Sequence, residues 1–256
     1  MKVIVLAGGE AGLEDPLYDL TIGGYKALLE LSGKAMIQWV VDAINAAEKI
    51  DEILLVGLPE SVEVSSKKPL MRLEDQHGMI KNVIAAARTL VEKGASPDEQ
   101  VLLMSGDIPG IRGEILDWMV DEVSVVDYDM VYSLIERKAM ESRYPGSKRS
   151  YIKLNDVEVC GGDVSAFRLR IALQENPLVN ALTHARKNVF KQARLIGFST
   201  LILLLLRIIS LSELEKRICE KLELNGKALL NPYAEAGMDV DKPFQYEIMK
   251  ADLKEK

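Results

Sequence analysis

The sequence predicts an α/β fold in which helices cover both faces of a central parallel sheet. Two observations lead to this prediction. Apolar, β-branched runs with the length of buried strands alternate with amphipathic helical segments along the first half of the chain. Such alternation builds βαβ units with right-handed crossovers. The chain has 256 residues, 48% of them hydrophobic, enough for one large domain or one domain with an appendage.

Four strands and three helices are expected in the first half. The strands are the apolar runs at residues 2–7, 52–57, 100–107 and 129–135. The helices occupy the intervals, at residues 34–47, 79–94 and 112–123. The spacing of a single helix face is clearest in the first helix, at Met36, Trp39, Val40, Ala43, Ile44 and Ala47. This part of the chain therefore carries the sheet and most of its cover.

The second half is less regular. Residues 150–168 are expected to form short strands, with turns at Asn155–Asp156 and Gly161–Gly162. A short strand at 227–230 and a terminal helix at 242–253 follow near the end of the chain. These elements extend the sheet domain beyond the alternating region.

A mainly helical block at 177–224 interrupts this second half. Ser212 begins its last helix, with Glu215 three residues later in a capping-box pattern. We predict a main domain of residues 1–176 plus 225–256, and a helical insertion at 177–224 that is not an independent domain.

The helical block contains one strongly apolar stretch, "LIGFSTLILLLLRII" at 195–209. Arg194 and Arg207 bracket its uninterrupted part, which is shorter than the ~18–20 residues that a membrane span requires. A buried helix is the simplest interpretation. A contact in a homo-oligomer and a helix lying in a membrane interface remain alternatives.

Composition restricts the classes of partner and compartment. A net charge of −7 and a pI near 5.1 argue against general nucleic-acid binding, but allow a small anionic ligand held by local cations or a metal. Cys160 and Cys219 form no CxxC pair and are expected as free thiols. His77 and His184 do not predict a zinc site. The apolar run after Met1 is too short for a signal peptide, so we expect a cytoplasmic protein.

Candidate functional residues follow the predicted strands, because ligands of open α/β sheets bind at the carboxyl ends of the strands. Gly8 and Gly9 come directly after the first strand, where their backbone could approach a nucleotide closely. A plain tight turn is the alternative interpretation of this pair.

Carboxylates provide the second set of candidates. Asp107 ends the third apolar strand, where it could hold a hard cation such as Mg²⁺ or, alternatively, cap the following helix. Asp239 and Asp241 share a face if their segment is extended. One of them could bind the metal while the other caps the terminal helix, or both could simply form the turn.

Four motifs in order carry a resemblance to a known family: "VIVLAGG", "YKALLELSGKAMIQWVVDAI", "GDIPGI" and "GMDVDKPFQYE". They resemble GT-A type nucleotidyltransferases of the MobA-like NTP transferase family, which includes molybdenum-cofactor guanylyl- and cytidylyltransferases and sugar-phosphate nucleotidyltransferases. The resemblance covers about residues 1–168 and roughly the last twenty residues. It implies a Rossmann-like three-layer α/β/α sandwich, here with an additional C-terminal helical block.

The resemblance also implies roles for residues of the first loop. The backbone of Leu6, Ala7, Gly8 and Gly9 would bind base, ribose and phosphate. Lys26 matches the lysine that closes this loop onto the phosphates, and we name it as a catalytic residue.

Further roles are implied downstream. Asp107 matches the catalytic metal-binding aspartate, and Asp239 best matches the second carboxylate that holds Mg²⁺. Gly78 and Asn82 match a segment that contacts the base. Lys34 stands at the start of a helix where relatives often have Lys or Arg.

The first loop departs from the family pattern GGxSxRMGxxK, in which an arginine holds the NTP tail. Residues 10–25 contain neither Arg nor Lys, and the acids Glu10, Glu14 and Asp15 precede Asp19. Whether a loop without this arginine supports turnover is left open by the sequence.

A second departure lies at "GGDVSAF", where relatives with an acceptor site often read GGN, so Asp163 could face the acceptor or the metal. Cations nearby in the sequence are Lys148, Arg149 and Lys153. They are interpreted either as contacts for an anionic acceptor or as a solvated charge cluster.

These observations predict an Mg²⁺-dependent nucleotidyltransferase. It would join an NMP from an NTP to a small phosphorylated acceptor, such as a sugar, polyol or pterin phosphate, and release pyrophosphate. A GT-A glycosyltransferase is one alternative, although the strand before "GDIP" ends in one acid rather than a DxD motif. A non-catalytic nucleotide-binding or oligomerisation module is the other, favoured by the acidic loop and the helical block.

Overall fold

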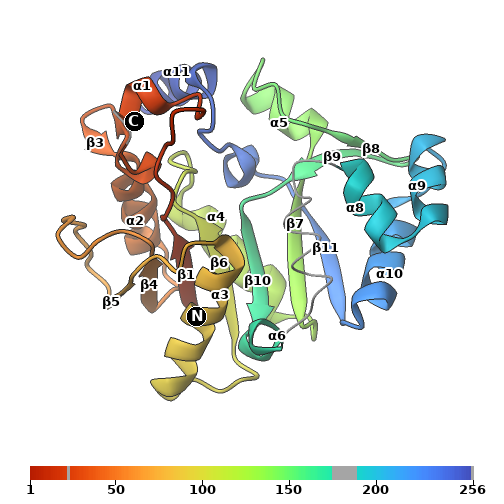
Figure 1. Ribbon diagram of the computed structural model, residues 1–256, viewed down its shortest axis with the longest axis horizontal. Helices are drawn as coiled ribbons and strands as arrows, with labels where there is room; N and C mark the ends of the chain where they lie inside the picture. Colours follow the sequence, from red (N-terminus) through yellow and green to blue (C-terminus); the bar gives the residue numbers. More distant parts are fainter. Residues whose placement is uncertain (22–23, 175–188, 255–256) are drawn as a thin grey trace.

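A nine-stranded mixed sheet forms the centre of the protein in the computed structural model, which describes residues 1–21, 24–174 and 189–254 (Figure 1). The strands lie in the order β5 (Leu70–Leu73), β4 (Glu52–Val56), β1 (Lys2–Leu6), β6 (Gln100–Ser105), β10 (Val164–Arg168), β7 (Met130–Glu136), β9 (Glu158–Gly161) and β8 (Ile152–Lys153). The last strand, β11 (Gly226–Asn231), pairs with β7 in parallel. The predicted α/β class is confirmed.

The sheet is mixed: the parallel pairing expected from the first half is present, and the strands of the second half add antiparallel pairs. Strands β5, β4, β1 and β6 pair in parallel, as the alternating first half predicted. Strand β10 is antiparallel to β6 and also to β7, between which it lies. The short strands of residues 150–168 return by turns rather than by helical crossovers, and such connections produce antiparallel pairs.

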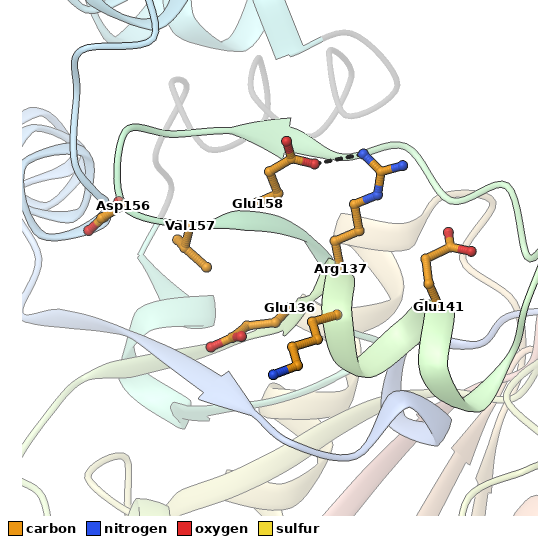
Figure 2. A pocket seen from close by; sticks show the side chains of 7 residues that line it. Glu136, Arg137, Glu141, Asp156, Val157 and Glu158 are labelled. Carbon is orange, nitrogen blue, oxygen red and sulfur yellow. Dashed lines mark hydrogen bonds and ion pairs between the residues drawn. The ribbon is translucent and has the colours of Figure 1, made fainter.

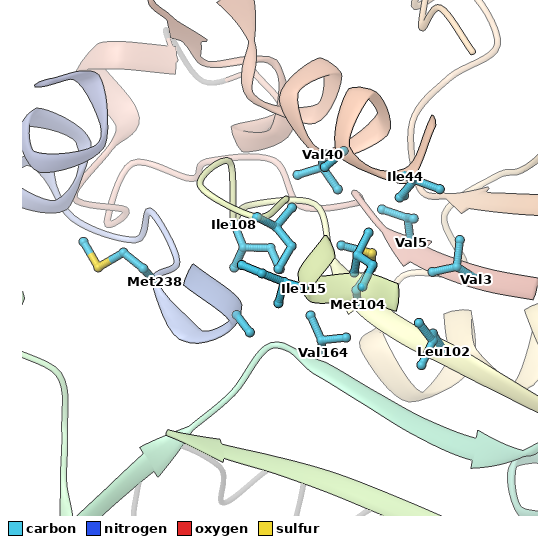
Figure 3. Close-up of a cluster of buried hydrophobic side chains, with 14 of the residues drawn as sticks. Val3, Val5, Val40, Ile44, Leu102, Met104, Ile108, Ile115, Val164 and Met238 are labelled. Carbon is cyan, nitrogen blue, oxygen red and sulfur yellow. The ribbon is translucent and has the colours of Figure 1, made fainter. Parts of the chain in front are cut away.

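Helices cover the sheet on both faces because side chains alternate along each central strand. Val3 and Val5 face the layer formed by α2 (Met36–Ala46) and α4 (Gly113–Ser124) (Figure 3). Ile4 faces the opposite layer, formed by α3 (Met79–Glu92) and α6 (Leu169–Leu173). The three-layer arrangement therefore follows from two separate apolar clusters.

Smaller elements surround these layers. They are α1 (Tyr18–Thr21), the 3₁₀ turns η1 (Lys26–Leu28) and η2 (Ala234–Gly237), the hairpin of β2 (Glu30–Leu31) and β3 (Lys34–Ala35), α5 (Arg137–Arg143) and the terminal helix α11 (Pro243–Asp252). The sequence did not predict β5, α5 or α6. All three are short, and short elements carry little periodicity.

The apolar stretch in the helical block forms two helices rather than one. Helix α8 (Val189–Ile196) ends before Gly197, and α9 (Phe198–Leu205) begins after it. The next helix, α10 (Leu211–Leu222), is capped by Ser210, whose Oγ accepts a hydrogen bond from Glu213 N at 3.2 Å. The predicted cap at Ser212 is therefore wrong by two residues. Of the helical segment predicted over 177–190, residues 177–188 lie outside the described residues and the last two belong to α8.

The helical block packs on the edge of the sheet. Leu204 and Ile209 are buried against Leu134, Leu154 and Val159 of the sheet side. Other apolar residues remain exposed: Ile202, Leu205, Leu206 and Ile208. The interpretation as a buried helix thus holds for one face, and a homo-oligomer contact stays a prediction. Among the described residues, no helix is long and apolar enough to cross a membrane.

Gly57 permits the closest backbone approach near the carboxyl edge of the sheet. It has φ +105°, and a Cβ atom there would lie 2.3 Å from Gly8 Cα. We expect Gly57→Ala to lower the free energy of unfolding by about 2–4 kcal/mol, through both backbone strain and this clash. Urea denaturation measures the loss. Gly94→Ala is the matched control, with φ +99° and no atom within 4 Å, and should lose only about 1 kcal/mol. Equal losses would show that the contact with Gly8 is unimportant.

Candidate active site

The glycine turn after β1 lies where three parallel strands end. Ala7 N donates to Val56 O at 2.8 Å, and Gly106 N donates to Leu6 O at 2.8 Å. These hydrogen bonds align the ends of β1, β4 and β6. The predicted backbone segment Leu6–Gly9 therefore stands at the carboxyl edge of the sheet, where α/β proteins bind ligands.

The segment predicted to contact a base lies beside this turn. Asn82 is only 4% exposed, and its side chain is used within the loop. Its Oδ1 accepts from Gln76 N at 2.7 Å, and its Nδ2 donates to Asp75 Oδ1 at 2.8 Å. Gly78 precedes helix α3 as its N-cap residue. In this structure Asn82 holds the loop that borders Gly8.

Lys26 is held between two carboxylates. Its Nζ lies 2.6 Å from Asp15 Oδ2 and 3.3 Å from Asp241 Oδ1. Burial would lower the pKa of Lys26, but these two carboxylates raise it, so the ammonium group is charged. The acidic first loop thus supplies a counter-ion to the lysine predicted to bind phosphate.

Three separate segments bring further acids to the same edge of the sheet. Val240, inside the DVD motif, donates its N–H to Asp107 O at 3.0 Å. Asp163 N donates to Ala236 O at 2.7 Å, and Asp163 O accepts from Ser105 N at 3.0 Å. Backbone hydrogen bonds therefore tie the end of β6 to the segment before β10 and to the segment after η2.

Arg149 inserts among these acids. Its guanidinium donates to Asp239 Oδ1 and lies 3.6 Å from Asp163 Oδ2, and its side chain is only 13% exposed. Interpretation as a solvated charge cluster is therefore wrong for Arg149. Lys148 differs, because its Nζ lies over the ring of Phe244, 5.1 Å from the centroid. Lys153 is more exposed and lies 3.5 Å from Glu158.

Each buried carboxylate disfavours the ionised form of its neighbours, because like charges repel. Burial and then the charge of Asp241 raise the pKa of Asp107, against opposing contributions from Ser105 and Lys26. Burial also raises the pKa of Asp239 to about 7, with Arg149 acting in the opposite direction.

Asp163 is shifted in the same sense. Burial, followed by the charges of Asp239 and Asp107, raises its pKa well above the ordinary value. The native fold therefore holds more negative charge at this edge than its own cations compensate.

The acids fit a divalent cation that is shared with a substrate. Among the described residues, Asp107 Oδ1 and Asp163 Oδ2 are buried and accept no hydrogen bond. Within the same residues, no three His, Cys, Asp or Glu side chains are arranged to hold a metal by themselves. Mg²⁺ is commonly bound by one or two carboxylates together with substrate phosphates, and the assignment of this role to Asp107 and Asp239 stays a prediction.

Helix capping does not explain these acids. The N-cap of α4 is Arg112 rather than Asp107, and the N-cap of α11 is Lys242 rather than Asp241. The capping alternatives are therefore wrong. Instead, Asp241 N donates to Gln245 Oε1 at 3.0 Å, which fixes the DVD segment to the start of α11.

Lys34 lies away from the acids and is paired elsewhere. Its Nζ is 2.7 Å from Asp42 Oδ2 and 4.3 Å from the Trp39 ring centroid. The structure thus uses Lys34 at the surface of α2.

The cysteines and histidines are not among the predicted site residues, although Cys160 lies beside Arg149. Cys160 and Cys219 are free thiols, and burial raises the pKa of each, which disfavours a thiolate. His77 is almost fully exposed and lies 3.6 Å from Asp75. His184 lies outside the described residues.

Sequence reasoning missed two contacts of this site. It treated Asp15 only as an acidic residue in a loop where the family pattern has an arginine. It did not predict that Arg149 pairs with Asp239, 90 positions away. The usable signal was charge balance: an acidic loop beside a buried lysine implies a pair, but long-range partners cannot be read from spacing.

A hollow outside the candidate site lies beside α5. It has a volume of about 650 Å³ and lies between the start of α5 and β9, where Arg137 Nη1 contacts Glu158 Oε2 at 2.8 Å (Figure 2). Its lining mixes cations and carboxylates, of which Arg137 and Glu158 form an ion pair, and contains none of the predicted site residues.

The glycine turn, the paired lysine and the buried carboxylates together form a candidate nucleotide-binding site at the carboxyl edge of the sheet. The chain belongs to the MobA-like NTP transferase domain family, whose model matches residues 3–189. This is a family of nucleotidyltransferases. The family resemblance expected from the sequence is thereby confirmed.

Individual relatives agree with this assignment. A probable molybdenum cofactor guanylyltransferase of Thermococcus sibiricus is 27% identical over 121 residues, which are 46% of this chain and 54% of that protein. The chain thus spans about half the length of the curated relatives it matches.

Solved structures extend the likeness. A hypothetical transferase from Thermus thermophilus superposes with a TM-score of 0.79 at 29% identity, covering 96% of this chain and 98% of that one. Molybdopterin-guanine dinucleotide biosynthesis protein A from Archaeoglobus fulgidus, at 16% identity and a TM-score of 0.52 over 100% of both chains, shares the fold.

The pKa of Asp163 predicts that this carboxylate destabilises the protein without ligand. A raised pKa in the folded state means that stability falls as pH increases from about 4, where the unfolded carboxyl ionises. We expect Asp163→Asn to raise the free energy of unfolding at pH 8 by at least about 1 kcal/mol. In this variant the free energy of unfolding should also decrease less steeply with pH.

Urea denaturation between pH 4 and 8 measures this difference. Asp42→Asn is the control, because hydrogen bonds from Lys34 and Gln38 lower the pKa of Asp42 despite its partial burial. That variant should gain no stability at pH 8. A destabilised Asp163→Asn protein would contradict the electrostatic account.

Proposed function

We propose that this protein is an Mg²⁺-dependent nucleotidyltransferase that joins an NMP from an NTP to a small phosphorylated acceptor. One observation carries the proposal: buried carboxylates gather beside a glycine turn and a charged lysine at the carboxyl edge of the sheet. Membership in the nucleotidyltransferase family supports it. The same family membership makes nucleotidyl transfer a better supported proposal than sugar transfer.

The acids would hold the cation. Asp107 offers a buried oxygen that accepts no hydrogen bond from a described residue, and Asp239 lies in the segment that Val240 ties to Asp107. Bound there, Mg²⁺ would neutralise phosphate charge and polarise the α-phosphate. The carboxylates would be ionised in that complex, because a cation favours their charged form.

Lys26 would neutralise the β- and γ-phosphates. A phosphate oxygen of the acceptor would form a bond to the α-phosphorus while the bond to the pyrophosphate oxygen breaks, and pyrophosphate would leave with that electron pair. An acceptor phosphate is already anionic, so no general base is needed. Catalysis of this kind depends on positioning and charge stabilisation. The glycine turn would place the nucleotide through its backbone N–H groups.

A non-catalytic nucleotide-binding module is the second candidate. The observation that favours it is the pairing of Lys26 with Asp15, because this carboxylate competes with phosphate for the lysine. Binding without turnover in the assays below would support this candidate.

Asp107→Asn tests the metal role. We expect pyrophosphate release, measured with each of the four NTPs, Mg²⁺ and a panel of sugar, polyol and pterin phosphates, to fall at least about 100-fold, or ~2.7 kcal/mol. Asp121→Asn is the control, since Asp121 pairs with Lys49 at the surface. Full activity in Asp107→Asn would refute the assignment, and transfer only from nucleotide-sugars would favour a glycosyltransferase.

Asp15→Asn tests the counter-ion of Lys26. Without this carboxylate, phosphate has no competitor at this position for the ammonium group of Lys26. NTP should therefore bind roughly three- to tenfold more tightly. Calorimetric titration of NTP in the presence of Mg²⁺ measures the change. Weaker binding would instead show that Asp15 positions Lys26 for the nucleotide. Glu14→Gln controls for the loss of one charge from the same loop.

A further inference from the structure

We propose that Arg149 is an exchangeable counter-ion of the metal site: it neutralises Asp239 in the free protein and binds a phosphate of the NTP once Mg²⁺ takes that carboxylate. This inference rests on the proposed function. It gives the triphosphate an arginine from outside the first loop.

Arg149 contacts two acids and one backbone carbonyl. One guanidinium nitrogen donates to Asp239 Oδ1, while the other lies 3.6 Å from Asp163 Oδ2 and donates to Gly161 O at 3.3 Å. The side chain is 13% exposed and the Asp239 side chain 15% exposed. Arg149 therefore occupies the position of a cation between two buried acids.

Arg149 and a metal would compete for one oxygen of Asp239. A metal bound to Asp239 must approach its carboxylate to about 2.0–2.1 Å. A guanidinium on the same oxygen would repel a divalent cation at that distance. Asp107 has no ion pair with Arg149 among the described residues, and its Oδ1 accepts no hydrogen bond from them. A metal that takes Asp239 Oδ1 would therefore displace Arg149, whereas a metal on Asp107 needs no such exchange.

Arg149 lies in an irregular segment of the chain. Residues 147–151 form no helix or strand, and Lys148 has φ +51°. Arg149 thus extends from an irregular connection between α5 and β8. Its side chain can change partners without unfolding either element.

The first loop lacks basic side chains. Residues 10–21 contain neither Arg nor Lys, so the loop cannot hold a triphosphate by side-chain charge. A phosphate brought to Asp239 by a divalent cation comes within reach of Arg149, which already contacts that carboxylate. Its planar fork is suited to two phosphate oxygens.

Arg149→Met tests both halves of the exchange. We expect Mn²⁺, followed by electron paramagnetic resonance without nucleotide, to bind about tenfold more tightly, because its competitor is gone. We expect ATP, GTP, CTP and UTP, titrated calorimetrically at saturating Mg²⁺, to bind at least tenfold more weakly wherever the wild type binds. Unchanged Mn²⁺ affinity or unchanged NTP affinity overturns the proposal.

Two further variants serve as a control and as a replacement for this test. Lys148→Met removes one charge from the adjacent position, which faces Phe244, and should leave Mn²⁺ affinity within twofold. If Arg149→Met does not fold, Arg149→Lys carries the test: it should retain weak Mn²⁺ binding yet lose NTP affinity, and normal NTP affinity overturns the proposal. A wild-type protein that binds no NTP refutes the proposed function itself, whereas a binding wild type with an unaffected Arg149→Met refutes only this inference.

Discussion

The structure of this site depends on burying several carboxylates at one edge of the sheet. Asp107, Asp163 and Asp239 come from three segments, and burial raises the pKa of each. Two cations make this arrangement tolerable, since Arg149 pairs with Asp239 and Lys26 pairs with the neighbouring Asp241. A fold that keeps such charges out of water must compensate them internally or with a ligand.

The compensation is incomplete, and the first loop adds a further acid to the network. An arginine there would bind the triphosphate in the family pattern, whereas this chain has Asp15 in contact with Lys26. The site without ligand is therefore organised by ion pairs between its own residues. A metal with its nucleotide would bring charge of both signs into this network, and the proposed reaction begins with an exchange of partners.

The topology of the sheet brings these groups together. Strand β10 lies antiparallel between β6 and β7, so the residue before it, Asp163, stands beside the end of β6. The segment after β11 then crosses the same edge and delivers Asp239. Both placements come from the irregular second half, which the helical block interrupts. The block itself packs on the sheet through Leu204 and Ile209.

The sequence by itself determined the elements and part of the site. Periodicity located β1, β4, β6 and their helices, and motif order identified the family with Lys26, Asp107 and Asp239 as candidates. Only the tertiary structure decided that β10 is antiparallel, that Asp15 holds Lys26 and that Arg149 pairs with Asp239. Local patterns report which face of an element is apolar. Ion pairs between residues 90 positions apart depend on how strands are ordered, and that order leaves no periodic signal.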